Sequence, residues 1–308
     1  MTDSSSIDTV PIRVAVLGMG TMGAAMARAL LRSGFDVTVW NRSREKTRPL
    51  LDAGARVASD PADAVRNTDV VLTMLFDSAA VLEIAAAFLP AMPVGAIWMQ
   101  SSTIGAEGMQ AVAAAASSSR VSVVDAPVLG TKDPAEHAAL TVLASGGDRA
   151  VATLQPVFDA IASRTIVVGD RLGAASDLKL VCNAWVGSLT AGTAQSVALA
   201  RAFGLDPKLF LDAISGSASD SPYAHIKGAT ILEGKREPQF ALDGLLKDLR
   251  LAQSTAGPAN DTPYLDALER LYATASDGGH GREDVAWVYD AIDVPGLVVS
   301  APSTSGQR

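Results

Sequence analysis

A glycine-rich turn near the start of the chain constrains the fold more than any other feature. The run Gly18-Met19-Gly20-Thr21-Met22-Gly23 follows a β-branched stretch from Ile12 to Leu17 and opens a helical stretch from Thr21 to Arg32. In such a turn the first glycine permits a tight bend and the second lets a pyrophosphate approach the backbone. The third lets helix and strand pack closely, and the helix N-terminus faces the anion. Because the required strand and helix flank the pattern, the sequence predicts a bound dinucleotide.

The first half of the chain alternates strand and helix patterns, which is typical of a doubly wound parallel sheet in an α/β domain. One helix start is explicit, because Asp60 precedes Pro61 and can cap the helix that Pro61 opens. The predicted strands are Ile12–Leu17, Val37–Trp40, a strand from Val57, Val70–Leu75, Ile97–Gln100, Val121–Asp125, Ala139–Ser145 and Thr165–Val168. A helix is predicted over Arg44–Ala53.

After Gly169 the pattern becomes helical, with one long helix over Leu178–Phe203 that starts near Ser176. Further helices are predicted at Pro207–Ser215, Leu242–Thr255, Tyr264–Ala275 and Val285–Ile292. We therefore expect a Rossmann domain at 11–170 and, at 171–299, the long interdomain helix with an all-helical substrate and dimerisation domain. The Ser/Thr-rich residues 1–10 and 300–308 are expected to be disordered tails.

Composition excludes several classes of protein. The 308 residues suffice for two domains, and the net charge of −8 argues against a nucleic-acid partner. No apolar run is long enough to span a membrane, and the N-terminus lacks a basic leader. Cys182 is expected to be an inert core residue. The three histidines are far apart and do not have the spacing of metal ligands. We therefore expect a protein without a bound metal, and we expect it to be cytoplasmic. We also expect that no histidine has a partner that would make it the catalytic acid.

The end of the second strand decides which dinucleotide is bound. NAD binders place Asp or Glu about twenty residues after the glycines, where it accepts hydrogen bonds from the ribose. Here the residues are Asn41-Arg42-Ser43, with no carboxylate to repel a phosphate. Arg42 can instead make a charge-assisted contact with a phosphate, and Ser43 can donate as well. We predict NADP(H), held by these three residues and the glycine turn. Leu75 and Phe76, where the strand Val70–Leu75 ends, are also assigned to the cofactor.

Several separated motifs resemble those of the β-hydroxyacid dehydrogenases, the relatives of 3-hydroxyisobutyrate and 6-phosphogluconate dehydrogenase. The resemblance runs from about Ile12 to about Ile292. It rests on Gly20-Thr21-Met22-Gly23-Ala24-Ala25-Met26, Gln100-Ser101-Ser102-Thr103, Asp125-Ala126-Pro127-Val128, the stretch Gly173–Asn183, and Phe240 with Lys247-Asp248-Leu249. It implies an oxidoreductase in which Thr103 lies near nicotinamide and substrate, and in which Lys179 and Asn183 are catalytic. It also implies that Lys247 lies near the cofactor, and Asp248 near the substrate or Lys179, with Phe240 in a motif that closes the cleft.

The chemistry of carbonyl reduction agrees with the role implied for Lys179. The reaction needs a proton donor at the developing alkoxide, which a lysine can provide. Asn183 lies four residues on, so both side chains share one helix face about 5–6 Å apart at Cβ. The alternative is an ordinary solvated lysine at a helix start. A lysine in the first turn opposes the helix dipole, however, and such an unfavourable placement favours a functional role.

Other assigned residues have plain structural alternatives. Thr103 could cap a helix, and both roles could hold at once. Lys247 and Asp248 could be a solvated ion pair, since neighbouring residues face different directions on a helix. The small-residue face from Ala184 to Ala200 is suited to packing between the subunits of a homodimer, although it could equally be an intrachain core.

The substrate motif departs from the family pattern at Leu129, where the family usually has a serine that binds the substrate carboxylate. Leu129 has no side-chain donor, Gly130 preserves the close backbone approach, and Thr131 could replace the lost hydroxyl. The following Lys132–Glu136 is similar to the glyoxylate and succinic semialdehyde reductase branch, which we take as the first choice of substrate class. The alternatives are imine reduction, which the retained Lys179 disfavours, and a non-catalytic NADP-binding protein.

Overall fold

The computed structural model describes residues 12–257 and 259–292, so the expected tails 1–10 and 300–308 lie outside the described residues. The chain divides into two compact units between Leu180 and Val181, and each is described by itself. Among the described residues, no helix is both long and apolar enough to cross a membrane.

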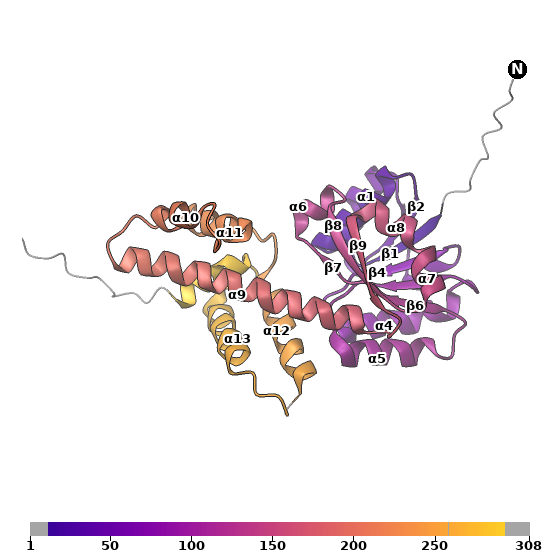
Figure 1. Ribbon diagram of the computed structural model, residues 1–308. Helices are drawn as coiled ribbons and strands as arrows, with labels where there is room; N and C mark the ends of the chain where they lie inside the picture. The colour runs from indigo at the N-terminus through magenta and orange to yellow at the C-terminus, as the bar shows by residue number, and fades with distance from the viewer. Residues whose placement is uncertain (1–11, 258, 293–308) are drawn as a thin grey trace, which may run out of the picture. The chain divides into compact units, whose positions relative to one another are not determined.

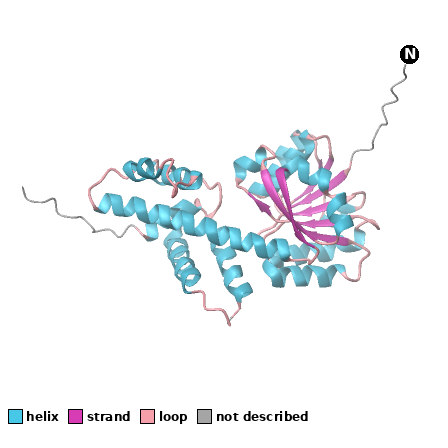
Figure 2. Ribbon diagram, viewed as in Figure 1, coloured by secondary structure: helices cyan, strands magenta, loops and turns pink. Residues whose placement is uncertain are grey.

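The described part of the first unit forms a nine-stranded sheet with the order β3-β2-β1-β4-β5-β6-β8-β7, in which β9 also pairs with β8 (Figure 1, Figure 2). The pairs from β3 to β6 are parallel, as is β8 with β9. The strands are β1 (Arg13–Leu17), β2 (Asp36–Trp40), β3 (Arg56–Val57), β4 (Val70–Thr73), β5 (Ile97–Gln100), β6 (Ser122–Asp125), β7 (Val128–Leu129), β8 (Leu140–Ser145) and β9 (Ala162–Gly169).

Apolar clusters cover both faces of this sheet. Side chains alternate along β1, with Val14 and Val16 in one cluster and Ala15 and Leu17 in the other. Helices α1 and α8 pack into the first cluster, and α3, α4 and α5 into the second. The predicted doubly wound α/β fold is therefore confirmed. The helices are α1 (Thr21–Arg32), η1 (Arg44–Thr47), α2 (Arg48–Asp52), α3 (Pro61–Val65), α4 (Ser78–Phe88), η2 (Leu89–Ala91), α5 (Gly105–Ala116), α6 (Lys132–Glu136), α7 (Asp148–Thr153) and α8 (Gln155–Ile161).

Three details of this unit differ from the sequence prediction or complete it. The Asp60 cap is confirmed, because its carboxylate accepts the amide of Asp63. The helix predicted over Arg44–Ala53 is instead divided into η1 and α2, since Pro49 in the second piece has no N–H to continue the ladder. The two-residue strand β7 was not predicted, and it runs antiparallel to β8, which is also antiparallel to β6. The sheet is thus parallel except at these two pairings.

The second unit has no strand among its described residues and is built from helices. Helix α9 (Ala174–Ala202) begins in the first unit and continues into the second. It is followed by α10 (Lys208–Ile214), α11 (Pro222–Leu232), α12 (Leu242–Ala256), α13 (Pro263–Ala275), η3 (Ser276–His280) and η4 (Val285–Ala291). Helix α11 was not predicted, although Ser221 before Pro222 is a helix-start signal. The helix predicted at Val285–Ile292 is the 3-10 helix η4.

The alanine-rich face of α9 packs inside its own unit. Ala191, Ala194 and Ala198 join one apolar cluster with residues of α12 and α13, including Leu245 and Tyr272. Of the two alternatives for this face, the structure therefore shows an intrachain core.

Candidate functional site

The three glycines of the turn differ in their surroundings, as a dinucleotide site requires. Gly18 has φ +109°, and a Cβ there would lie 2.3 Å from the carbonyl oxygen of Met74. A Cβ on Gly23 would lie 1.9 Å from the carbonyl oxygen of Gly18, so α1 packs directly on the turn. A Cβ on Gly20 would meet no atom of another described residue within 4 Å. Gly18 and Gly23 thus let the chain pack closely, whereas Gly20 leaves space in front of the N-terminus of α1.

That N-terminus offers backbone amides to an anion. Gly20 is the cap residue of α1 and has no side chain to bond the first amides, and the first turn holds no acidic residue. Because uncapped amides and the helix dipole both favour negative charge, the residues present fit a pyrophosphate group.

Asn41 joins the glycine turn to the end of β2. Its Oδ1 accepts the amide of Met19 at 2.9 Å, and its Nδ2 donates to the carbonyl oxygen of Ser43 at 3.0 Å. Arg42 is exposed, and Ser43 precedes η1 without capping it through its side chain. The structure thus gives Asn41 a bracing role and leaves Arg42 and Ser43 next to the turn that Asn41 braces.

A buried hydrogen-bond network lies under the loops that follow β4 and β5. The Oε1 of Gln100 accepts from the amide of Ser102 at 2.7 Å and from the hydroxyl of Thr73 at 3.2 Å. The hydroxyl of Ser102 in turn accepts the amide of Leu75 at 2.8 Å. This network fixes Leu75 and also the backbone that leads to Thr103. Thr103 is not a helix cap, because the cap residue of α5 is Ile104.

Two neighbours of this network are also positioned. Phe76 follows Leu75 and is exposed. The hydroxyl of Ser101 is buried and has no hydrogen-bond partner among the described residues.

Three of the residues assigned to the substrate lie consecutively, from the last residue of β7 to the residue before α6. Leu129 ends β7 opposite Thr141 and is half-buried. Gly130 has φ +125°, and a Cβ there would come within 2.7 Å of Leu140, so the position needs glycine. Thr131 is the cap residue of α6 but its side chain makes no capping bond, which leaves its hydroxyl available to another group.

Lys179 lies on α9 and is 9% exposed. The alternative of a solvated lysine is therefore wrong. The helix starts at Ala174, before the predicted start, so Lys179 lies in the second turn and not in the first. The dipole effect is confined to the terminal turn, so the position of Lys179 on the helix does not indicate a function. Its burial does indicate one, because a buried lysine is rare.

Asp125, at the end of β6, holds the start of α9. Its Oδ2 accepts the amide of Ser176 at 2.8 Å, and its Oδ1 accepts the hydroxyl of Ser176 at 2.8 Å. Ser145 donates to the same carboxylate at 3.3 Å and accepts the amide of Ala175 at 3.0 Å. Burial raises the pKa of Asp125 to about 6, although the serine hydrogen bonds oppose this shift.

In the second unit, Asn183 is joined to the Lys247-Asp248 pair. The Nδ2 of Asn183 donates to Oδ2 of Asp248, and the ammonium of Lys247 contacts Oδ1, both at 2.5 Å. Asp248 and Asn183 are buried, so the pair is not the solvated ion pair of the alternative. The ring of Phe240 lies against Gly244 at the start of α12, where a Cβ would be 3.0 Å from it.

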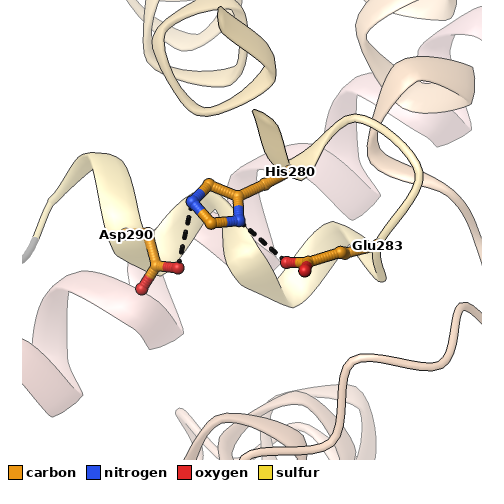
Figure 3. Close-up of side chains that lie close together, drawn as sticks. All are labelled: His280, Glu283 and Asp290. Atoms are coloured by element: carbon orange, nitrogen blue, oxygen red, sulfur yellow. Dashed lines mark hydrogen bonds and ion pairs between the residues drawn. The ribbon is translucent and has the colours of Figure 1, made fainter. Parts of the chain in front are cut away.

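Two histidines have carboxylate partners that their spacing in the sequence did not indicate. His225 lies 2.7 Å from Asp220. The ring nitrogens of His280 lie 2.8 Å from Glu283 and 3.2 Å from Asp290, as Figure 3 shows. The sequence did not indicate these two carboxylate contacts, and neither of them gives a histidine the role of the catalytic acid.

The three potential ligand atoms of the His280 cluster lie within 4.8 Å of one another, a spacing that a metal ion could use. Arg236, however, contacts Glu283 and lies 3.1 Å from Asp290, with its guanidinium 3.6 Å above the ring of Trp287. Because this cation already pairs with both carboxylates, we interpret the cluster as an ion-pair network of the helical unit.

Two family models match consecutive parts of the chain. Residues 13–169 match the NAD binding domain of 6-phosphogluconate dehydrogenase. Residues 173–292 match the model described as NAD-binding of NADP-dependent 3-hydroxyisobutyrate dehydrogenase.

Individual proteins match over almost the whole length. Glyoxylate/succinic semialdehyde reductase 2 of Arabidopsis thaliana, a chloroplastic protein, is 30% identical over 94% of this chain and 82% of its own. The structure of a 3-hydroxyisobutyrate dehydrogenase from Salmonella typhimurium superposes with a TM-score of 0.84 at 29% identity, over 91% of this chain and 99% of that one. The structure of Psf3 in complex with NADP+ and 2-OPP gives a TM-score of 0.85 at 26% identity, over 91% and 99% of the two chains.

Proposed function

The chain belongs to the β-hydroxyacid dehydrogenase family and is an NAD(P)-dependent oxidoreductase, and from this premise we propose that it reduces a small aldehyde or keto acid with NADPH, using Lys179 as the proton donor. When bound, the cofactor supplies the hydride that the carbonyl carbon accepts. The ammonium of Lys179 gives a proton to the carbonyl oxygen and is left as the amine, so the product is an alcohol. In the opposite direction the amine of Lys179 takes the proton back.

The burial of Lys179 is the observation that carries the proposal. At 9% exposure the lysine is largely removed from water, which is costly for a structural lysine but useful for a group that must release a proton. One turn further along α9, Asn183 donates to the buried carboxylate of Asp248. This bond orients the Asn183 amide, whose remaining donor and acceptor can hold a substrate oxygen. We therefore assign Lys179 to proton transfer and Asn183 to orientation.

We assign the cofactor as NADP(H) from residues that follow β2. Asn41 braces the site through one acceptor bond to the turn and one donor bond to Ser43, and its remaining N–H and lone pair can contact the ribose. Arg42 is exposed beside it and is free to make a planar contact with a 2′-phosphate, in place of the carboxylate that NAD binders use. The NADP+ complex of Psf3 and the NADP-dependent family model support the same assignment. Thr103, Leu75, Phe76 and Lys247 remain proposed cofactor contacts.

The substrate class follows from Leu129, Gly130 and Thr131. Gly130 keeps a backbone approach open, and the uncommitted hydroxyl of Thr131 can bind a carboxylate oxygen. The relationship to a glyoxylate and succinic semialdehyde reductase supports a short semialdehyde or keto acid. Imine reduction is the second candidate, favoured by Leu129, which makes this side of the pocket more apolar than a serine does.

A substrate panel tests these proposals. Purified protein is assayed for NADPH oxidation with glyoxylate, succinic semialdehyde, methylmalonate semialdehyde, tartronate semialdehyde and a cyclic imine. We expect turnover of at least one aldehyde or keto acid, and at most slow reduction of the imine. Turnover of the imine alone would replace the proposal by its second candidate. A flat response across the panel, with NADPH still bound, would indicate a non-catalytic NADP-binding protein.

We also propose a homodimer, formed by the outer face of α9 and not by its alanine face. Val181 and Trp185 are exposed near the start of this helix, and Leu199 and Phe203 are exposed around its end. Exposed apolar side chains of this size are typical of a face that a second subunit covers. Sedimentation of the wild type and of Trp185→Glu tests this, and a wild-type monomer would contradict it.

A further inference from the structure

A carboxylate that cannot touch the substrate is held at the start of the helix that bears Lys179. Asp125 is 0% exposed, so its side chain reaches neither solvent nor a ligand in solution. Both of its oxygens are used, one by the amide of Ser176 and one by the hydroxyl of the same residue. A third contact, from Ser145, ties the carboxylate to the strand β8 and through the amide of Ala175 to α9 again.

These contacts determine both the position of α9 along its axis and its rotation about it. A single hydrogen bond to a helix terminus leaves the helix free to turn, whereas Asp125 and Ser145 together hold three groups of two consecutive residues. Ser176, Lys179 and Asn183 are spaced i, i+3 and i+7, so they form one stripe along the helix, and all three are buried. The rotation that Asp125 fixes at Ser176 is therefore also the rotation of the stripe that carries Lys179.

We propose that Asp125 is a positioning residue for Lys179, because its carboxylate anchors the first turn of α9 and thereby aims the lysine ammonium at the reacting carbonyl. The inference rests on the proposed role of Lys179. The first residue of the Asp125-Ala126-Pro127-Val128 motif thus holds α9, whereas the proposed substrate contacts are made by Leu129, Gly130 and Thr131, which follow the motif.

The size of the effect follows from helix geometry. With side chains an α-helix is about 10–12 Å across, so a rotation of roughly 10–20° moves an outer atom by about 1–2 Å. A misplacement of about 1 Å at a reacting group can cost on the order of 100-fold in rate. Loss of the anchor should therefore lower kcat by roughly 10–100-fold and leave binding of the dinucleotide at the glycine turn unchanged.

The energetics support a carboxylate kept for a purpose. Burial opposes ionisation of Asp125 and raises its pKa to about 6, and the nearby charge of Asp177 acts in the same direction. Asp177 is itself paired with Arg171 at 2.6 Å, which keeps part of its charge away from Asp125. A protonated acid or an asparagine offers one acceptor and one donor, which still match the amide and the hydroxyl oxygen of Ser176.

Four variants test the proposal. Asp125→Ala removes both acceptors, Asp125→Asn keeps one acceptor and one donor, and Ser176→Ala removes only the hydroxyl contact. The matched control is Asp60→Ala, which removes the carboxylate cap of α3, a helix that bears no assigned site residue. For each variant, kcat and KM of the best panel substrate, the Kd of NADPH and the amide exchange of residues 174–182 are measured.

The expected result is a kcat at least tenfold lower in D125A, with the Kd of NADPH within threefold of wild type. D125N should recover kcat to within threefold of wild type, and D60A should keep full kcat while losing thermal stability. A D125A enzyme with wild-type kcat would overturn the proposal. A D60A enzyme whose kcat falls as much as that of D125A would also overturn it. If D125A fails to bind NADPH because it does not fold, the kcat of S176A tests the proposal instead. A loss of at least threefold in its kcat supports the proposal and wild-type kcat overturns it.

Amide exchange separates this inference from the proposed function. If no substrate is turned over, or if Lys179→Ala stays active, the proposed function is wrong whatever Asp125 does. The anchor is then still tested, because faster exchange at residues 174–182 in D125A supports it and unchanged exchange contradicts it.

Discussion

Gly20 and Gly23 belong to one turn, yet their replacement by alanine should have opposite consequences. A Cβ on Gly23 would lie 1.9 Å from the carbonyl oxygen of Gly18, and no contact under 3.0 Å is tolerable there because the oxygen belongs to the backbone. Helix α1 must move away from the turn by about 1 Å. Overpacking of this kind costs about 3 kcal/mol, which in a unit of this size lowers Tm by about 6–12 °C.

The same change at Gly20 meets open space. Gly20 has φ −75° and ψ −173°, which alanine adopts without strain, and nothing described lies within 4 Å of its Cβ. Replacement of a glycine cap by alanine costs about 0.5–1 kcal/mol, and the stiffer unfolded chain returns about 0.4–1 kcal/mol. The added methyl instead occupies the space through which a pyrophosphate reaches the backbone, so affinity for NADPH should fall at least about tenfold, or about 1.4 kcal/mol.

Two measurements distinguish the variants: thermal unfolding without cofactor, and titration of NADPH by fluorescence. G23A should melt well below the wild type, whereas G20A should melt within about 2 °C of it and bind NADPH weakly. Tight NADPH binding by G20A would refute the assignment of the space at Gly20 to the cofactor. An unchanged Tm in G23A would refute the reasoning from close packing.

Three further predictions concern cofactor choice, pH and substrate choice. Arg42→Ala should raise KM for NADPH about 10–100-fold, the worth of a charge-assisted hydrogen bond, with little change for NADH, and equal effects in steady-state kinetics would contradict it. Because burial raises the pKa of Asp125 from 3.8 to about 6, its contribution to stability is full below pH 3.8 and is lost as the pH rises through 6. The free energy of unfolding of Asp125→Asn minus that of wild type should therefore increase by about 2 kcal/mol between pH 4 and pH 7 in urea titrations, and a flat difference would exclude this. Leu129→Ser adds a hydroxyl donor, worth about 1 kcal/mol, and should raise kcat/KM for glyoxylate severalfold relative to a bulkier aldehyde. An unchanged ratio would remove Leu129 from the substrate pocket.

The features predictable from the sequence are those with a local signature. The glycine turn with its strand and helix was predictable because the turn needs particular residues at fixed spacing, and the Asp60-Pro61 helix start is of the same kind. Strand β7 has only two residues and therefore no periodicity to detect.

The contacts that sequence analysis missed join residues far apart in the chain. Asp125 meets Ser176 across 51 positions, and Arg236 meets Asp290 across 54. No spacing rule covers such pairs, because the fold alone brings them together. The same holds for the burial of Lys179, which sequence context indicated only indirectly.

Lys179→Ala offers the most direct test of the central claim. NADPH binding is measured by fluorescence, and reduction of the best panel substrate is followed in a single turnover. We predict a Kd for NADPH within threefold of wild type and a reduction rate below a tenth of the wild-type rate, because the proton donor is lost while the glycine turn is intact. A variant that keeps more than a tenth of the wild-type rate would contradict the role of Lys179.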